Sequence, residues 1–407
     1  MSTLTKNRIE SLDLLKGLVI VIMALDHTRD YFHYSSYFFD PTDPTLTTVP
    51  LFFTRFITNF CAPTFSFLAG TSAYMVSKRK TLNELSQFLL KRGLWLVFVE
   101  LVIIDFGWCF DITFRSVIFQ VIWILGISMI FLAGLIHLPK KAILIFSCLL
   151  IFGHNFLDNI HFDNSILWAF LHERKAFLTT PDHIFRVGYG VIPWVAVMSL
   201  GYYFGSFYDN TYEPSKRKKL FNTIGIAAII FFVILRGINI YGNLLPWKDY
   251  GNLTQTLFSF LSLTKYPPSL SFLLVTLGGA FLFLANTEKL KGKVVNFFCV
   301  FGRVPFFFYI IHIYLIHLLA LIVAELTGFG WQKMILPAQP FRVEALRGFG
   351  FNLFIVYLTW ILVIALLYPL CKKFDSYKQS HKEQWWLSYL KNVLRIYSLN
   401  ISIFFNQ

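Results

Sequence analysis

The sequence predicts an all-α, polytopic integral membrane helix bundle of about ten transmembrane helices. The first observation is composition: of 407 residues, 56% are hydrophobic, 19% are aromatic and only 14% are charged. Soluble domains are usually about a quarter charged and less than half apolar, so polar surface here is too scarce for a soluble fold. The second observation is pattern. A transmembrane β-barrel would show alternating segments of about ten residues, whereas this chain carries long apolar runs.

Ten apolar runs approach the roughly 20 residues that a helix needs to cross a bilayer. We expect these spans at residues 12–28, 51–76, 94–110, 116–136, 142–157, 187–207, 220–241, 266–286, 304–326 and 350–371. With both termini in the cytoplasm, 22 of the 36 Lys and Arg residues fall in short inner segments and 12 in outer segments and span ends, while Lys16 and Arg303 lie in or beside spans. The positive-inside rule therefore predicts cytoplasmic termini.

The net charge of +14 follows mostly from this topology. Because no basic stripe with stacking aromatic residues remains, we expect no nucleic-acid partner. The sequence divides into a transmembrane domain, 1–371, and a cytoplasmic tail, 372–407. In that tail Trp385, Trp386 and Leu390 share one predicted helix with Lys391 and Arg395, which is typical of an amphipathic helix lying against membrane lipids.

Ionisable residues inside a bilayer are costly, so each is a functional candidate. Lys16 and His27 are eleven residues apart in the first predicted span. Eleven steps of about 100° place both side chains on one helix face, about 16 Å apart along the axis. Asp30 follows His27 by three positions and can contact it on the helix surface. The pattern indicates a general base, His27, oriented by Asp30, although snorkelling of Lys16 and His27 to the headgroups stays open.

A second polar cluster opens the ninth predicted span. Pro305 suits a first helical turn, Arg303 precedes it at the cytoplasmic edge, and Tyr309 and His312 follow on one face. Tyr309 and His312 together indicate a polar cavity in the membrane, and His317 is the weaker candidate.

The long outer connector carries four histidines, at positions 154, 161, 172 and 183. Their spacing of seven, eleven and eleven residues matches no compact ligand pattern for zinc. The sequence therefore predicts no metal site.

Four motifs together resemble one known family. They are Arg8-x-x-Ser11-x-Asp13-x-x-Lys16-Gly17 with Asp26-His27, Pro63-x6-Gly70-Thr71-Ser72, Arg115-x4-Gln120, and Gly302-x-x-Pro305-x3-Tyr309-x-x-His312. In order and span context they resemble the heparan-α-glucosaminide N-acetyltransferase catalytic-domain family, most closely its uncharacterised bacterial branch. The spacing of Lys16 and His27 is also similar to that of inner-membrane acyltransferases that O-acetylate surface sugars. The chain departs from the lysosomal enzyme at His27, where that enzyme has asparagine.

The resemblance implies an integral-membrane acyltransferase, in its simplest form an acetyltransferase. The donor would be cytoplasmic acetyl-CoA or another acyl-CoA, and its phosphates are expected near Arg8, Lys16 or Arg303. The acceptor would be an amine or hydroxyl of a sugar or amino sugar on the outer side of the cell inner (plasma) membrane. His27 would act as general base, with His312 and Tyr309 lining the site and stabilising the oxyanion. A covalent acetyl-histidine stays open.

Two other functions stay open from the residues alone. The polar core could pass a solute or proton in a transporter or lipid-handling protein, or it could only hold helices together in a scaffold. The sequence leaves open which acceptor is used and how long the acyl chain is. It also leaves the oligomeric state open, and a homo-oligomer is one alternative.

Overall fold

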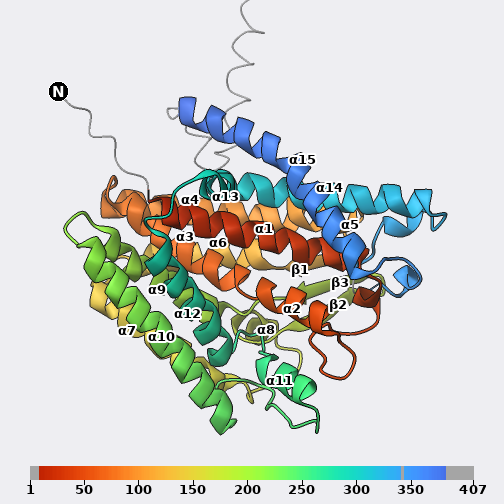
Figure 1. Cartoon of the computed structure of the whole chain (residues 1–407), viewed down its shortest axis with the longest axis horizontal. Coiled ribbons are helices and arrows are strands. Elements are labelled where there is room, and N and C mark those ends of the chain that lie inside the picture. Colours follow the sequence, from red (N-terminus) through yellow and green to blue (C-terminus); the bar gives the residue numbers. More distant parts are fainter. Residues whose placement is uncertain (1–8, 341–342, 382–407) are drawn as a thin grey trace, which may run out of the picture.

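The computed structural model describes residues 9–340 and 343–381 and is built almost wholly from helices (Figure 1). In chain order the α-helices are α1 (Glu10–Phe32), α2 (Val49–Thr58), α3 (Cys61–Ser77), α4 (Leu82–Phe98), α5 (Asp105–Cys109), α6 (Val121–Leu135), α7 (Lys140–Gly153), α8 (Ile166–Leu171), α9 (Val191–Gly205), α10 (Pro214–Ile238), α11 (Leu253–Leu261), α12 (Leu270–Thr287), α13 (Lys293–Arg303), α14 (Pro305–Leu326) and α15 (Leu353–Ser380). A π-helical segment, η2 (Val99–Ile104), joins α4 to α5, and the short 3₁₀ turn η3 (His154–Leu157) ends α7.

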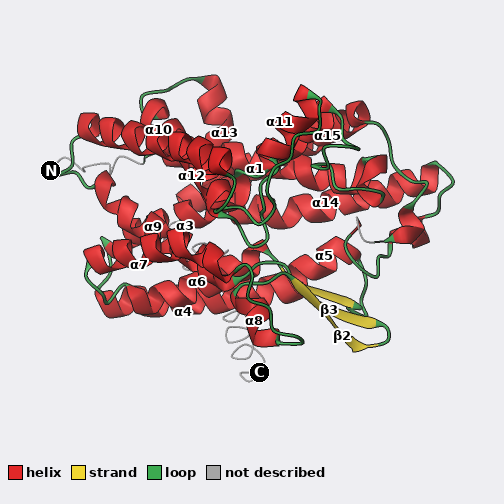
Figure 2. Cartoon of the chain, turned by 90° about the horizontal axis from the view of Figure 1, so that it is seen from below, coloured by secondary structure: helices red, strands yellow, loops and turns green. Residues whose placement is uncertain are grey.

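A small sheet that the all-α prediction missed lies beside α5 at the edge of the molecule (Figure 2). Its strands are β1 (Ser116–Phe119), β2 (Lys175–Thr180) and β3 (His183–Val187), in the order β1-β3-β2. β1 runs parallel to β3, with Ser116 opposite Ile184, and β2 is antiparallel to β3. The sheet brings the connector after α5 together with the connector before α9.

Helix α1 lies at the centre of the bundle and packs against α2, α3, α12, α13, α14 and α15. Figures 1 and 2 show α7, α10 and α12 on one side of it and α14 and α15 on the other. Most of α1 is buried although it carries several charged side chains. Charged groups in such a position must pair with one another or line a cavity.

Glycines bring the backbones of several helix pairs into close contact. A Cβ on Gly17 of α1 would lie 1.8 Å from the Phe298 carbonyl oxygen of α13, and one on Gly302 would lie 1.8 Å from the Asp13 carbonyl oxygen. Gly93 of α4 and Gly126 of α6 face each other in the same way. Small residues at such crossings are typical of membrane helix pairs.

Five helices in the described part of the chain are long and apolar enough to cross a membrane: Lys140–Leu157, Pro214–Ile238, Leu270–Thr287, Pro305–Leu326 and Leu353–Ser380. Of these, α12 is mostly buried, while α10 and α15 expose apolar residues outward, among them Ile226, Ile230, Ile234, Phe354, Leu358 and Ile361. Helix α6 is apolar but shorter. The structure is therefore that of a helical membrane protein, and the total of ten spans and the cytoplasmic termini stay predictions.

Several predicted span boundaries were wrong. The run 51–76 is two helices, α2 and α3, and the run 116–136 begins with strand β1. The helix predicted from residue 94 begins at Leu82, where Thr81 and Glu84 form a capping box. The last helix continues to Ser380, past the predicted domain boundary at 371. The amphipathic tail lies largely outside the described residues and stays a prediction.

Candidate active site

Two histidines from distant parts of the chain meet in the centre of the bundle. His27 Nδ1 of α1 lies 2.8 Å from His312 Nε2 of α14, and the two rings stack with their centroids 5.0 Å apart. His312 Nδ1 lies 3.0 Å from the Phe308 carbonyl oxygen, one turn earlier in α14. His312 is fully buried, whereas His27 is partly accessible from a cavity.

These contacts assign the tautomers of the pair. The Phe308 carbonyl can only accept, so His312 Nδ1 carries a hydrogen, and Nε2 of the neutral ring holds a lone pair. His27 Nδ1 then donates to His312 Nε2. In a neutral His27 ring this leaves the lone pair on Nε2, the nitrogen that can take up a proton.

Aromatic side chains enclose the histidine pair. Trp108 of α5 packs edge-on against His27, at a centroid distance of 4.8 Å. Tyr309 packs edge-on against His312 at 5.4 Å and against His27 at 6.3 Å. The structure thus brings together three of the four residues predicted to be catalytic: His27, Tyr309 and His312.

The fourth, Asp30, has a different partner from the one predicted. Its Oδ1 accepts a hydrogen bond of 2.6 Å from Arg29 NH2. The same NH2 lies 2.9 Å from Asp26 Oδ1, and Arg55 NH1 of α2 lies 3.1 Å from Asp26 Oδ2. Arg29, the neighbour of Asp30 in the sequence, therefore binds the carboxylate that helical spacing had assigned to His27. The His27 ring is oriented by His312 instead.

Two cavities share Tyr309 in their linings. The first, which we call the Lys16 cavity, has a volume of about 210 Å³ and is lined by residues of α1, α3, α4, α6 and α14, among them Lys16, Ser72 and Arg92. The second, the His27 cavity, has a volume of about 790 Å³ and includes His27, Trp108 and residues of the sheet in its lining. Tyr309 and Val121 line both cavities.

The predicted donor-binding residues lie in different places. Lys16 Nζ donates a hydrogen bond of 2.8 Å to Ser72 Oγ and lines its cavity. Arg303 instead forms an ion pair with Asp375 of α15, at 2.6 Å, and is absent from the lining of both cavities. Arg8 lies outside the described residues. Arg92, which the sequence analysis did not single out, also lines the Lys16 cavity.

A buried carboxylate fixes the wall between the cavities. Glu100 lies in the π-helical segment η2, and its Oε2 accepts hydrogen bonds from the backbone N–H groups of Ile122 (2.6 Å) and Trp123 (2.9 Å). N–H groups in the first turn of a helix have no acceptor within that helix, and here Glu100 supplies one. Glu100 therefore anchors the start of α6, which carries Val121. A π-bulge at this point is typical of a functional site.

Positive charge predominates around the His27 cavity. Its lining has six basic residues, Arg29, Arg55, Arg174, Lys175, Arg186 and Lys265, and three acidic ones, Asp26, Asp30 and Asp40. Burial raises the pKa of Asp40 in the loop after α1, but hydrogen bonds from Thr42 and the nearby Arg55 outweigh it and lower that pKa below its usual range. Such a cavity favours a ligand that carries negative charge.

His33, the nearest alternative base, lies just beyond α1. Its Nδ1 is 2.6 Å from Ser35 Oγ. Burial, with a smaller contribution from Arg29, lowers the pKa of His33 to about 4. His33 is therefore neutral near pH 7, and it is not among the residues that line either cavity.

The four connector histidines separate into two kinds. His161 and His183 are exposed or half-exposed and contact Glu173 and Thr180. His154 and His172 are both buried and lie close to Asp158. In the part of the chain that the structure describes, this is the group whose side chains could hold a metal ion.

Comparison with known proteins identifies the family. No individual curated protein matches the chain. Residues 8–237, more than half of the chain and including α1 through α9, match the family model described as heparan-alpha-glucosaminide N-acetyltransferase, catalytic. The chain therefore belongs to this family of membrane acetyltransferases.

Proposed function

We propose that this protein transfers an acyl group, in the simplest case acetyl, from cytoplasmic acyl-CoA to an amine or hydroxyl on a sugar at the opposite side of the membrane. The observation that carries the proposal is the His27–His312 pair at the place where two cavities share Tyr309. A base at such a junction could reach an acceptor from one cavity and a thioester from the other.

The chemistry follows from the tautomers. His27 Nε2 takes the proton of the acceptor N–H or O–H while the acceptor nitrogen or oxygen attacks the thioester carbonyl carbon. The carbonyl oxygen becomes an oxyanion, and in this proposal the Tyr309 hydroxyl donates a hydrogen bond to it. The Tyr309 ring lies against the histidine pair, with its centroid 6.3 Å from that of His27. The C–S bond then breaks, and the CoA thiolate takes the proton from the His27 imidazolium. His312 holds the ring in place through His27 Nδ1.

The Lys16 cavity is suited to the donor. Its lining is mostly apolar, with Lys16 and Arg92 as cationic groups, and a pantetheine arm is thin and mostly neutral. Both cations are on segments predicted to face the cytoplasm, where they could bind the phosphates of acyl-CoA. Arg8 remains a further candidate for these phosphates.

The His27 cavity is suited to the acceptor. Its larger volume and its excess of basic over acidic groups favour a polar acceptor that bears an anionic group, such as an acidic glycan. In the topology that the positive-inside rule predicts, this cavity would open on the outer side of the membrane. In a bacterial cell that membrane would be the inner one.

Release of free CoA thiol tests the proposal. Purified full-length protein in lipid nanodiscs is mixed with acetyl-CoA and a panel of neutral and acidic amino sugars and glycans. We expect acceptor-dependent thiol release and an acetylated product by mass spectrometry. Acyl transfer would be contradicted if thiol release stayed at its acceptor-independent background for every acceptor in the panel and for several acyl-CoA chain lengths.

The adjoining cavities also fit a second function, passage of a solute across the membrane. Tyr309 would then act as a constriction between them. The same nanodisc experiment separates the two functions, because a transporter would bind acceptor or donor without consuming the thioester.

A further inference from the structure

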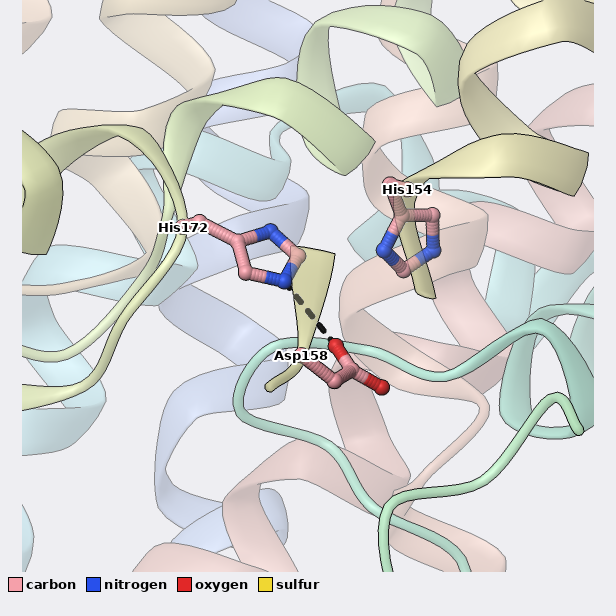
Figure 3. A group of neighbouring side chains, drawn as sticks. All are labelled: His154, Asp158 and His172. Carbon is pink, nitrogen blue, oxygen red and sulfur yellow. Dashed lines mark hydrogen bonds and ion pairs between the residues drawn. The ribbon is translucent and has the colours of Figure 1, made fainter. Parts of the chain in front are cut away.

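Three side chains on the outer connector converge on one point (Figure 3). His154 begins η3 at the end of α7, Asp158 follows that turn, and His172 ends α8. Each offers a ligand atom, and these atoms all lie within 4.8 Å of one another. His172 Nε2 is 2.9 Å from Asp158 Oδ1, and the two imidazole centroids are 5.7 Å apart.

The two imidazoles are buried without the hydrogen bonds that such burial requires. His154 and His172 are each 1% exposed. Neither ring nitrogen of His154, nor Nδ1 of His172, has a hydrogen-bond partner among the described residues. Leaving a buried polar atom without a hydrogen-bond partner destabilises the folded protein. Three such atoms in one cluster indicate that a ligand satisfies them.

A hydrogen-bonded neighbour holds the carboxylate in place. Asn155 Nδ2 donates to Asp158 Oδ2 at 2.8 Å, and Asn155 Oδ1 accepts from the backbone N–H of Leu270, the first residue of α12, at 2.8 Å. Asp158 is therefore oriented toward His172 by a residue that is itself fixed to a buried helix. Such outer partners are typical around metal ligands.

From this cluster we propose a zinc site, with His154, Asp158 and His172 as the three protein ligands and water in the fourth position. Two imidazoles and a carboxylate suit zinc and similar first-row ions, whereas calcium and magnesium prefer oxygen ligands. Ligand atoms in a tetrahedral zinc site lie about 3.3 Å apart. The ligand atoms here lie within 4.8 Å of one another, so a small inward movement of the side chains completes the geometry. The spacing of the connector histidines did not indicate this site, because the connector folds back on itself and brings His154 and His172 together.

The site would connect the outer connector to the helical bundle. His154 extends α7, whereas His172 stands two residues before Arg174, a lining residue of the His27 cavity. The backbone of His172 also packs against Gly190 at the start of α9, where a Cβ would lie 2.9 Å from it. Zinc would thus fix the segment that supplies Arg174 and Lys175 to the cavity wall.

Metal uptake by the full-length protein in detergent tests the site. The protein is stripped with chelator, loaded with Zn²⁺, desalted and assayed by elemental mass spectrometry. We expect about one zinc ion per chain for a three-ligand site, and Co²⁺ in its place should give the visible absorption bands of tetrahedral cobalt. Retention of less than about a tenth of an ion per chain, with no cobalt bands, would overturn the proposal.

Matched histidine variants from the same connector locate the ion. His154→Ala and His172→Ala should each reduce retained zinc at least tenfold, whereas His161→Ala and His183→Ala should keep it. Asp158→Asn is a milder variant for the case that alanine impairs folding, because it preserves the side-chain shape and the contact with the Asn155 amide. It should lower zinc affinity at least tenfold. Equal zinc retention in Asp158→Asn and wild type, or equal loss in His161→Ala, would place the ion elsewhere and overturn the proposal.

Discussion

His27 and His312 stand 285 positions apart in the chain, yet their ring nitrogens lie 2.8 Å apart and connect α1 to α14. The Phe308 carbonyl fixes one ring, and that ring fixes the other. The basic nitrogen of His27 therefore has a defined orientation without a carboxylate partner. A neutral pair of this kind holds a base ready without placing an additional charge in the membrane.

The contact between α1 and α13 should tolerate no added methyl group. Gly17→Ala places a Cβ 1.8 Å from the Phe298 carbonyl oxygen, so the helices must separate, at a cost of about 1–3 kcal/mol or more in unfolding free energy. We expect a lower thermal unfolding midpoint in detergent. Gly134→Ala in α6 is the control, because its Cβ meets nothing within 4 Å in the described structure. A Gly17→Ala protein as stable as Gly134→Ala would disprove the close contact.

Glu100 should act mainly as the anchor of α6. Glu100→Ala leaves the buried N–H groups of Ile122 and Trp123 without their acceptor, which costs roughly 1–3 kcal/mol for each group. Glu100→Gln keeps an acceptor oxygen and should lose much less. Thermal unfolding of the two variants beside wild type measures the difference. If alanine and glutamine had the same small effect, the carboxylate would not hold the helix.

The cations of the Lys16 cavity should bind the donor, and Arg303 should not. A charged hydrogen bond contributes roughly 1.5–3 kcal/mol, so Lys16→Ala and Arg92→Ala should each weaken acyl-CoA affinity about 10- to 150-fold. Arg303→Ala should instead lower stability, because it leaves Asp375 without its ion-pair partner. Calorimetric titration with a non-hydrolysable acyl-CoA analogue measures affinity, and Lys141→Ala controls for a general loss of positive charge. Wild-type affinity in both cavity variants would move the phosphates elsewhere.

Helical periodicity predicts how residues are placed within one helix. Lys16 and His27 of α1 each line one of the two cavities that share Tyr309. The same reasoning placed Tyr309 and His312 in a polar cavity, where the structure finds Tyr309. Positions within a single helix follow from 100° per residue, so these relationships were accessible from sequence.

Contacts between helices were not accessible in the same way. Nothing in the spacing indicates that His27 meets His312, or that Arg29 takes the Asp30 carboxylate. Strand β1 was missed because Ser116 and the three apolar residues that follow it, just before a helix, resemble the first turn of that helix. The start of α4 did have a local signal, the Thr81–Glu84 capping box. The family motifs are likewise partly structural, since Gly17 and Gly302 serve helix packing.

The turnover of a folded His27→Ala protein is the most direct test of the proposed catalytic role. If His27 is the base, turnover should fall about 10²- to 10⁴-fold, while acyl-CoA affinity stays near that of wild type. The unfolding midpoint should fall only modestly, because the buried His312 Nε2 loses one hydrogen-bond donor. His161→Ala, a histidine variant on the exposed connector, should keep full activity. Wild-type turnover in a well-folded His27→Ala protein would contradict the account.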